Sequence, residues 1–549
     1  MAAVQARRRG AWGVGIVLVL LLAALLRVPG LRWGLPDALH PGYSWHPDEI
    51  ATLVFARAMA IGQLVPKQFI YGGTLYFSLL NAFYYYGNLL RGLLGGVNEM
   101  GNALLLGRCI FTACSLLTIV LTWRIGVRLF NPVTGLLAAL FLALSPAHAF
   151  LAQTVRPDEL SALMGVLLVW LGVVILQGQR SGDRLHFAAA GLLLGLVAAL
   201  RLPLVVFGIA PTLAYVLRER DAGWASGLGA LLRWRLPLLA VVAATVYAFA
   251  SPYSLLHPDL LRAGMEVQSG YQKGSFADAV GRGPGIYQYG WLALRDALGA
   301  PLHLLALGGV LLALVRRNPS RLLLLAAALD YFIPVTLVSW VVVRYTVPVL
   351  PLLSLLAADA LVSLAARGPG WRRFAAAAVA GIAAWTLLGD LAFLRIQTGR
   401  NARELAADWI VANVPRGASV VEVQQYGRDV YLNPTIPTGY RHFEFGLGTG
   451  VDQLLLDDSP DHDYVVVNSA TYRNMDRLGA RNPQNGAYAL QQVLDSGHYE
   501  IAAEIAVPVR LLGIDYSAQF TSQDFNIINP GERIYRYVAT PAQKTAAPG

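Results

Sequence analysis

The sequence predicts a polytopic α-helical membrane protein, with about eleven transmembrane helices and a C-terminal α/β domain outside the membrane. Three observations predict this fold class. Of the 549 residues, 56% are hydrophobic and only 14% are charged, a composition typical of membrane proteins. Long apolar runs recur along residues 1–395. Residues 396–549, in contrast, return to the composition of a soluble domain.

The apolar runs are long enough to cross a bilayer, because a hydrocarbon core of ~30 Å needs roughly 20 mostly apolar residues. The predicted spans are residues 12–29, 103–123, 134–150, 160–176, 187–200, 203–217, 236–250, 300–315, 322–343, 346–365 and 374–393. Between the fifth and sixth spans, Arg201, Leu202 and Pro203 can form either a tight outer turn or a kink in one long helix.

The distribution of basic residues favours the turn, because short cytoplasmic loops collect Lys and Arg. With Arg201 on the outer side, every inward connection is basic. These connections contain Arg7, Arg8, Arg9, Arg124, Arg128, Arg180, Arg184, Arg218, Arg220, Arg233, Arg316, Arg317, Arg321, Arg367, Arg372 and Arg373. We therefore expect a cytoplasmic N-terminus and an extracytoplasmic C-terminal domain. Topology then explains most of the net charge of +10, and no nucleic-acid partner is implied.

Three sizeable segments are predicted on the outer side. A transmembrane domain, residues 1–395, carries outer loops at 30–101 and 251–298, and residues 396–549 form the separate domain. Within the first loop, residues 71–96 are apolar and rich in Tyr and Gly, which predicts a helix lying along the membrane interface. In the C-terminal domain, helical and strand patterns alternate, as in NARELAADWIVANVPRGASVVEV and GAYALQQVLDSGHYEIAAEIAV, which predicts an α/β fold.

Two short acidic motifs stand at outer helix starts. The first, GYSWHPDEI, places His46, Asp48 and Glu49 after the first span, and the second, TVRPDEL, places Asp158 and Glu159 before the fourth. A helix N-terminus alone explains one such motif, because proline fits the first turn and carboxylates favour the positive end of the helix dipole. Two copies on the same side indicate a shared site as well.

Basic side chains accompany these carboxylates. Arg156, Arg201 and Arg344 fall at outer ends of spans, and Lys67 and Lys273 fall in outer loops. Each arginine alone is explained equally well as an interface anchor. Together with the carboxylates, they suit a reaction on a lipid phosphate, in which arginines hold phosphate oxygens and a carboxylate acts as base.

The order of five segments resembles a known family. HPDE, RPDE, SPYSLLHPD, RYTVPVLPLLSLLAA and ADWIVANVPRGASV resemble the polyprenyl-phosphate-dependent glycosyltransferases of the GT-C fold, which include protein O-mannosyltransferases and the lipid A aminoarabinose transferase. The resemblance covers most of the chain. It implies inverting transfer of a sugar from an undecaprenyl- or decaprenyl-phosphate donor to an acceptor hydroxyl on the outer side of the membrane; a lipid, a glycan and a protein all stay open as acceptors. The bias towards Ala, Gly, Leu and Arg suggests a bacterial source, and therefore the plasma (inner) membrane.

The resemblance also implies roles for individual residues. Asp48 would be the general base, Glu49 would orient it, and Asp158 would line the same cavity. The leaving phosphate would be held by Arg156, Arg201 and Arg344, while His46, Glu159 and Tyr271 would line the sugar or acceptor pocket. Some relatives carry Lys-Pro-Pro where this chain has Tyr71-Gly72-Gly73, so that phosphate contact would fall to Tyr71, Lys67 or Lys273.

Three questions stay open at this point. A divalent cation, Mg, Mn or Ca, is a further hypothesis for Asp48, Glu49 and Asp158, because hard carboxylate oxygens suit these ions. A transporter or flippase for lipid-linked sugars would also have many spans and an outer domain. The sequence shows no inverted repeat, and its acidic motifs stand at one surface rather than mid-span, which favours the transferase. A non-catalytic lipid-binding scaffold would leave the paired motifs unexplained.

Overall fold

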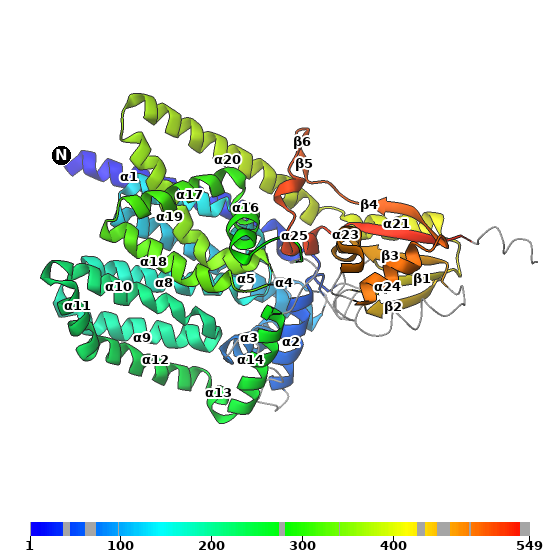
Figure 1. Ribbon diagram of the computed structural model, residues 1–549, viewed down its shortest axis with the longest axis horizontal. Helices are drawn as coiled ribbons and strands as arrows, with labels where there is room; N and C mark the ends of the chain where they lie inside the picture. Colours follow the sequence, from blue (N-terminus) through cyan, green and yellow to red (C-terminus); the bar gives the residue numbers. More distant parts are fainter. Residues whose placement is uncertain are drawn as a thin grey trace, which may run out of the picture.

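The computed structural model describes residues 2–36, 44–60, 73–96, 98–273, 280–339, 341–424, 434–446, 462–481 and 485–538. A large helical part and a smaller α/β part lie side by side along the long axis of the molecule (Figure 1). The N-terminus lies at the end of the helical part that is farthest from the α/β part.

In the helical part, the predicted spans coincide with helices or pairs of helices, except that the ninth extends beyond its helix. Its long elements are α1 (Ala2–Arg27), α5 (Glu99–Leu129), α6 (Pro132–Ala143), α7 (Pro146–Phe150), α8 (Pro157–Gln177), α9 (Asp183–Leu200), η4 (Leu202–Gly208), α10 (Ile209–Arg218), α12 (Leu236–Ala250), α17 (Ala300–Val315), α18 (Pro319–Val335), η8 (Val343–Val349), α19 (Leu350–Ala365) and α20 (Pro369–Thr398). Seven of the described helices are long and apolar enough to cross a membrane. The chain is therefore a multi-pass membrane protein, as predicted.

The predicted count of eleven spans is not confirmed by that criterion, and the reasons are local. The third predicted span is broken before Pro146, where α6 and the following helix bend by 66°; as one span, this pair would be the eighth. Helices Leu202–Arg218 and Ala300–Val315 are apolar but shorter than the other spans. The ninth predicted span extends to residue 343, whereas α18 ends at Val335, one residue after Pro334.

The stretch around Arg201 forms a turn between two helices, not a kink. Arg201 has an extended backbone between α9 and η4. Asp183, at the start of α9, accepts a hydrogen bond from Arg218 at the end of α10, with 2.9 Å between Nη2 and Oδ2. The start of one helix thus meets the end of the other, so α9 and α10 run antiparallel.

Shorter helices complete the helical part. They are η1 (Pro29–Arg32), α2 (Pro47–Ala60), α3 (Leu75–Leu89), α4 (Arg91–Leu94), η2 (Leu151–Gln153), η3 (Arg180–Gly182), η5 (Arg220–Ala222), α11 (Trp224–Ala230), η6 (Leu231–Arg235), α13 (Pro252–Leu256), α14 (Pro258–Lys273), α15 (Gly285–Tyr287), η7 (Gln288–Ala293) and α16 (Leu294–Leu298). The predicted interface helix corresponds to α3 and α4, and α3 packs on α5 through Phe83 and Phe111, whose ring centroids are 5.7 Å apart. Its position relative to a membrane stays a prediction.

The C-terminal part has the predicted α/β fold. Its sheet has the strand order β2-β1-β3-β7-β4, with β1 parallel to β2 and β3, and β7 antiparallel to β3 and β4. The elements are α21 (Ala402–Asn413), β1 (Ser419–Gln424), β2 (Arg441–Gly446), β3 (Tyr464–Asn468), α23 (Ser469–Leu478), η9 (Gly479–Arg481), α24 (Asn485–Leu494), β4 (Tyr499–Ile505), β5 (Arg510–Leu511), β6 (Ile514–Asp515), η10 (Ser517–Gln519), α25 (Gln523–Ile528) and β7 (Glu532–Tyr537). Apolar clusters pack on the two faces of this sheet.

The two parts share one apolar core. Phe520 and Phe525 of the α/β part belong to the main core of the helical bundle. The ring of Phe393 in α20 stacks on Phe520, with centroids 4.4 Å apart, and meets the edge of Phe525 at 5.3 Å. This joint fixes the α/β part against one end of the bundle.

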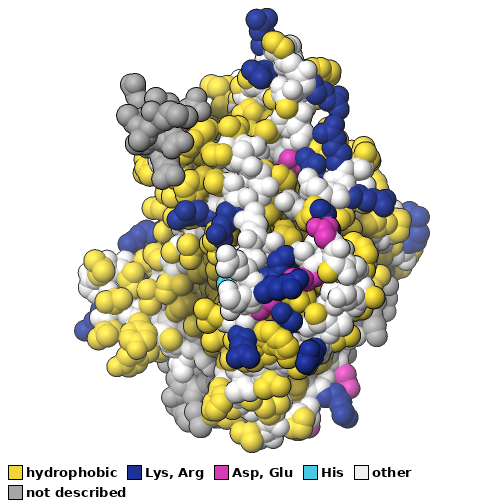
Figure 2. Space-filling view, turned by 90° about the vertical axis from the view of Figure 1, so that its left-hand side faces the viewer, with side chains coloured by type: hydrophobic (Ala, Val, Ile, Leu, Met, Phe, Trp, Pro, Cys, Tyr) yellow, Lys and Arg dark blue, Asp and Glu magenta, His cyan; other side chains and the backbone are white. Residues whose placement is uncertain are grey.

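The opposite end of the bundle is rich in basic side chains. Figure 2 shows this face with numerous Lys and Arg residues and few acidic ones. The turn between α8 and α9 and the end of α10 meet there through ion pairs of Arg180 with Glu219 and of Arg218 with Asp183. A basic end of the bundle accords with the cytoplasmic loops expected from the sequence; the orientation itself stays a prediction.

Candidate active site

Both acidic motifs stand at helix starts, and Arg156 joins them. α2 begins at Pro47 and α8 at Pro157, so each Asp-Glu pair lies in a first helical turn. Arg156, the residue before α8, forms an ion pair with Asp48 through Nη1 and another with Asp158, with 3.2 Å between Nε and Oδ2. Two motifs that are distant in sequence therefore form one cluster.

Two further arginines complete this cluster. Arg201, at the turn between α9 and η4, donates to Asp158, with 2.8 Å between Nη1 and Oδ1. Arg344, in η8, lies with Nη2 3.8 Å from Oδ2 of Asp48. Both guanidinium groups lie over the ring of Tyr345, at 5.1 and 5.6 Å from its centroid. The structure thus brings together Asp48, Asp158, Arg156, Arg201 and Arg344, and we name these five residues the Asp48 cluster.

Glu49 points away from this cluster into a closed pocket. Arg108 of α5 donates to both of its oxygens, from Nε at 3.0 Å and from Nη2 at 2.6 Å. The backbone N–H of Val155 and the hydroxyl of Ser44 donate to the same carboxylate at 2.6 and 2.7 Å. Burial by itself would raise the pKa of Glu49, but these donors hold it below the usual range. Glu49 is a buried, ion-paired anchor for the start of α2.

Asp48 is the accessible carboxylate of the pair. It exposes 39% of its side chain, whereas Glu49 is fully buried. Partial burial raises the pKa of Asp48, but Arg156 and Arg344 outweigh burial and hold the pKa well below its usual range. His46, just before α2, is buried, and burial together with Arg156 lowers its pKa to about 4. At neutral pH, an ionised carboxylate therefore stands beside a neutral imidazole.

Glu159 belongs to a different environment. It is buried inside the bundle, with one carboxylate oxygen 3.5 Å from Nε2 of His148. The other ring nitrogen of His148 lies 2.9 Å from Nη2 of Arg27, and Arg27 also donates to Ser115 at 2.9 Å. A buried polar chain thus runs from the second motif into the bundle core, away from Asp48.

The α/β part closes one side of the site. Asp524 of α25 accepts hydrogen bonds from the backbone N–H of Arg344 at 3.0 Å and from its Nη1 at 2.7 Å. Arg403 of α21 donates to the carbonyl of Ile527 and lies over the ring of Trp45, 5.1 Å from its centroid. The segment before α2 and the arginine of η8 are therefore both held by the C-terminal part.

Sequence reasoning did not identify Arg108 or Asp524. Arg108 carried a usable signal, because an arginine within an apolar span is costly unless it is paired. Asp524 carried none, since it is an ordinary acidic residue in the first turn of a short helix. Of the remaining predicted residues, Lys67 and Tyr71 lie outside the described residues, and so do the side chains of Tyr271 and Lys273.

The geometry gives no support to a cation shared by Asp48, Glu49 and Asp158. Glu49 points away from the two aspartates, and each of the three carboxylates is already paired with at least one arginine. Among the described residues, the group with the spacing of metal ligands is instead Glu422, His442 and Glu444, on strands β1 and β2.

Comparisons with known proteins identify the fold. A family model described as "Dolichyl-phosphate-mannose-protein mannosyltransferase" matches residues 96–252. The structure of ArnT from Cupriavidus metallidurans in the apo state matches at 16% identity and a TM-score of 0.50, over 96% of this chain and 98% of that chain. The apo oligosaccharyltransferase of Archaeoglobus fulgidus matches at 12% identity and a TM-score of 0.50, over 94% of this chain and 78% of that chain. A search of curated proteins found no match.

These findings confirm the resemblance that the motifs predicted. The chain has the GT-C glycosyltransferase fold along nearly its whole length. The fold does not favour the alternative of a transporter or flippase.

Proposed function

We propose that this protein transfers a sugar from a polyprenyl-phosphate donor to an acceptor hydroxyl, with inversion at the anomeric carbon. The observation that carries the proposal is the Asp48 cluster, in which a partly exposed carboxylate stands among three arginines at one end of a membrane bundle. The matching family model is named after a lipid-phosphate sugar donor, and ArnT of Cupriavidus metallidurans is also described bound to undecaprenyl phosphate.

The arginines suit the leaving group of this reaction. As the glycosidic bond to the lipid phosphate breaks, the phosphate gains a second negative charge, and positive groups already in position stabilise it. Arg156, Arg201 and Arg344 supply such groups, and each is held by a carboxylate that fixes its direction. No nucleotide is needed, because the sugar is already activated by its bond to phosphate.

Asp48 suits the role of general base, and its pairing explains how its basicity is controlled. A carboxylate with a strongly lowered pKa is ionised but accepts protons poorly. A donor phosphate that binds Arg156 and Arg344 competes with Asp48 for the same guanidinium groups. That competition raises the pKa of Asp48 towards its ordinary value when the donor is bound, which is when the acceptor hydroxyl must lose its proton.

Glu49 acts through position rather than proton transfer. Its ion pair with Arg108 ties the first turn of α2 to α5, and the N–H of Val155 ties it to the segment before α8. Arg108 in turn donates to the carbonyls of Leu31 and Trp33, at 2.9 and 2.6 Å. We assign Glu49 and Arg108 as positioning residues that set the distance between the two motifs.

The proposal includes a location and an orientation. The protein would lie in a bacterial plasma membrane, with the basic end of the bundle in the cytoplasm and the Asp48 cluster and the α/β part on the outer side. The accumulation of Lys and Arg on the face in Figure 2 supports this orientation, because cytoplasmic loops carry an excess of these residues.

The test is donor consumption by the purified protein. The full chain in detergent is incubated with radiolabelled polyprenyl-phosphate sugars, both hexoses and pentoses, together with a membrane extract as acceptor source. We expect release of free polyprenyl phosphate from at least one donor, and we expect Asp48→Asn to abolish it. Asp221→Asn is the matched control, since Asp221 is 93% exposed at the basic end. A folded protein that consumes no donor, or an equally active Asp48→Asn variant, would contradict the proposal.

A further inference from the structure

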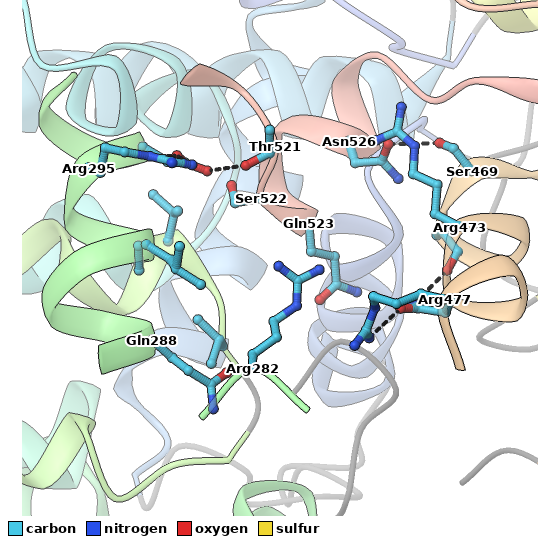
Figure 3. Close-up of a pocket in the computed structure, with 17 residues that line it drawn as sticks. Arg282, Gln288, Arg295, Ser469, Arg473, Arg477, Thr521, Ser522, Gln523 and Asn526 are labelled. Atoms are coloured by element: carbon cyan, nitrogen blue, oxygen red, sulfur yellow. Dashed lines mark hydrogen bonds and ion pairs between the residues drawn. The ribbon is translucent and has the colours of Figure 1, made fainter. Parts of the chain in front are cut away.

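A second basic region lies between the helical part and the α/β part. A cavity of ≈ 210 Å³ opens there, bounded by η7, α16 and the start of η8 on one side and by α23 and the segment from Thr521 to Asn526 on the other. Figure 3 shows Arg282 and Arg295 entering from the helical part and Arg473 and Arg477 from α23. The cavity is large enough for a group of several heavy atoms, well beyond a single water molecule.

Positive charge in this cavity exceeds negative charge. Four arginines line it, against one carboxylate, Asp296. Asp296 is already engaged, by Arg295 at 2.9 Å and by the hydroxyl of Thr521 at 2.8 Å. Among the described residues, neither Arg282 nor Arg473 forms an ion pair with a carboxylate. The arginines that line the cavity therefore carry more positive charge than its one carboxylate neutralises.

Neutral polar groups in the wall add to this character. The hydroxyl oxygen of Ser522 is buried and has no hydrogen-bond partner among the described residues. Gln288 is only 5% exposed, and its Nε2 donates to the carbonyl of Gly283 at 2.7 Å, while its Oε1 has no hydrogen-bond partner among the described residues. Asn526 accepts from Ser469 at 2.7 Å, which fixes its carboxamide in the wall. The Ser522 hydroxyl can donate a hydrogen bond to an anionic occupant, whereas Oε1 of Gln288 only accepts hydrogen bonds and would need a donor such as water.

We propose that this cavity binds a phosphate-bearing group, as a second anion site beside the Asp48 cluster. Phosphate carries more charge than a carboxylate and directs its oxygens to several sides, so it suits guanidinium groups that converge from different elements. An arginine also presents its N–H donors in pairs, which match two oxygens of the same phosphate.

The two sites are neighbours but do not share arginines. Val343 and Gln523 line the cavity, and the residues that follow them, Arg344 and Asp524, pair with each other on the side of the Asp48 cluster. This inference rests on the proposed function only in treating the Asp48 cluster as the donor site. If the donor binds there, the occupant of the second cavity is a different molecule. Binding of phosphate in the second cavity does not depend on where the donor binds.

The test measures binding of radiolabelled pyrophosphate to the full chain in detergent by equilibrium dialysis, with and without saturating undecaprenyl phosphate. We expect Arg473→Gln and Arg282→Gln each to weaken pyrophosphate binding by about 10-fold, the effect of losing one charge-assisted contact. Arg481→Gln is the matched control, because Arg481 is an exposed arginine in η9 outside the cavity. Undecaprenyl phosphate should leave this binding intact in the wild type.

Each result is decisive. Wild-type binding in both cavity variants, an equal loss in Arg481→Gln, or full displacement by undecaprenyl phosphate would overturn the second site. Unfolding temperatures of the variants report whether a loss of binding reflects a loss of folding; Arg473→Gln should not shift them. Failure of the proposed function would give a different result: the protein would consume no donor but would still bind pyrophosphate through Arg473.

Nanodiscs identify the source of the phosphate. If adding phosphatidylglycerol to phosphatidylcholine discs weakens pyrophosphate binding in the wild type but not in Arg473→Gln, the cavity takes a lipid headgroup. If phosphatidylglycerol has no effect, the cavity takes a phosphate group from outside the bilayer. Both outcomes require binding that depends on Arg473.

Discussion

The two Pro-Asp-Glu motifs have the same local structure and different surroundings. Each begins a helix, α2 or α8, with proline in the first turn followed by two carboxylates. In the first motif, the glutamate is locked against Arg108 and the aspartate is partly exposed. In the second motif, the aspartate is the buried partner of Arg156 and Arg201, and the glutamate faces the bundle core.

This contrast teaches that local sequence places the carboxylates but distant residues assign their roles. The helix dipole favours all four acidic side chains equally. Their accessibility and strength as bases depend on arginines from α5, from the segment before α8, from the turn after α9 and from η8. A carboxylate that is buried and surrounded by hydrogen-bond donors stabilises the structure. A carboxylate that is paired with arginines but partly exposed to solvent is available for the reaction.

The largest expected effect separates the two glutamates. Glu49→Gln leaves the charge of Arg108 buried without its partner, which should cost roughly 3 to 5 kcal/mol of stability. Glu159→Gln, the matched change, removes no arginine partner within ion-pair distance and should cost much less. Thermal unfolding of both variants in detergent checks this. Part of the loss should return in the double variant Glu49→Gln with Arg108→Met, and equal losses in the two single variants would break the comparison.

The second effect separates the two aspartates. Asp48→Asn keeps the shape of the side chain but removes the base, so the transfer rate should fall roughly 100-fold or more. Donor binding should survive or tighten, because a negative charge near the phosphate is gone. Asp158→Asn should change donor affinity more than the rate, since Asp158 holds two arginines. Single-turnover rates and donor Kd values distinguish the two, and a larger rate loss in Asp158→Asn would assign the base to the second motif.

A third change removes the residue that joins the motifs. Arg156→Gln should weaken donor binding by roughly 10-fold or more, the value of one charge-assisted contact to phosphate. The control is Arg124→Gln. Arg124 lies near the C-terminal end of α5, over the ring of Trp123. Equilibrium binding of labelled donor measures the effect. Unaltered affinity in Arg156→Gln would limit this arginine to holding the motifs together.

The smallest effect concerns pH. Only ionised Asp48 can accept a proton, and its pKa is held low by Arg156 and Arg344, so kcat/KM should stay level as the pH falls to about 5. In Arg156→Gln the pKa rises, and the acid limb should move up by roughly one pH unit. In the wild type, the acid limb of the kcat profile should lie at a higher pH than the acid limb of the kcat/KM profile, because the bound donor competes with Asp48 for the arginines. Coincident limbs would argue against that competition.

Much of the fold was predictable, because apolar length and helix-strand alternation are encoded locally. The α/β part and the positions of the spans followed from these patterns, and Arg201 was correctly predicted to form a turn. The patterns failed where proline interrupts a run, at Pro146 and near Pro334. Hydropathy averages over a window, so it does not register a single residue that bends or ends a helix.

The site was predictable only on the side of the motifs. The arginines at span ends were identified because charge is conspicuous beside apolar runs, and the structure brings Arg156, Arg201 and Arg344 to the two aspartates. Asp524 was not identified from the sequence, because it contacts Arg344 only when the α/β part docks on the bundle, and no local pattern encodes that docking. The division of labour between Asp48 and Glu49 also depends on Arg108, whose direction is set by tertiary packing.

The pairing of Arg344 with Asp524 has a consequence for biosynthesis. The two residues are separated by 180 positions, and the arginine belongs to a membrane helix that is made first. During translation, Arg344 is therefore made before Asp524, its carboxylate partner in the α/β part, has been synthesised. Over this interval Arg344 lacks the two hydrogen bonds that Asp524 accepts from it. Completion of the site is thus coupled to docking of the α/β part, and a ribosome paused before Asp524 would hold a protein whose site is incomplete.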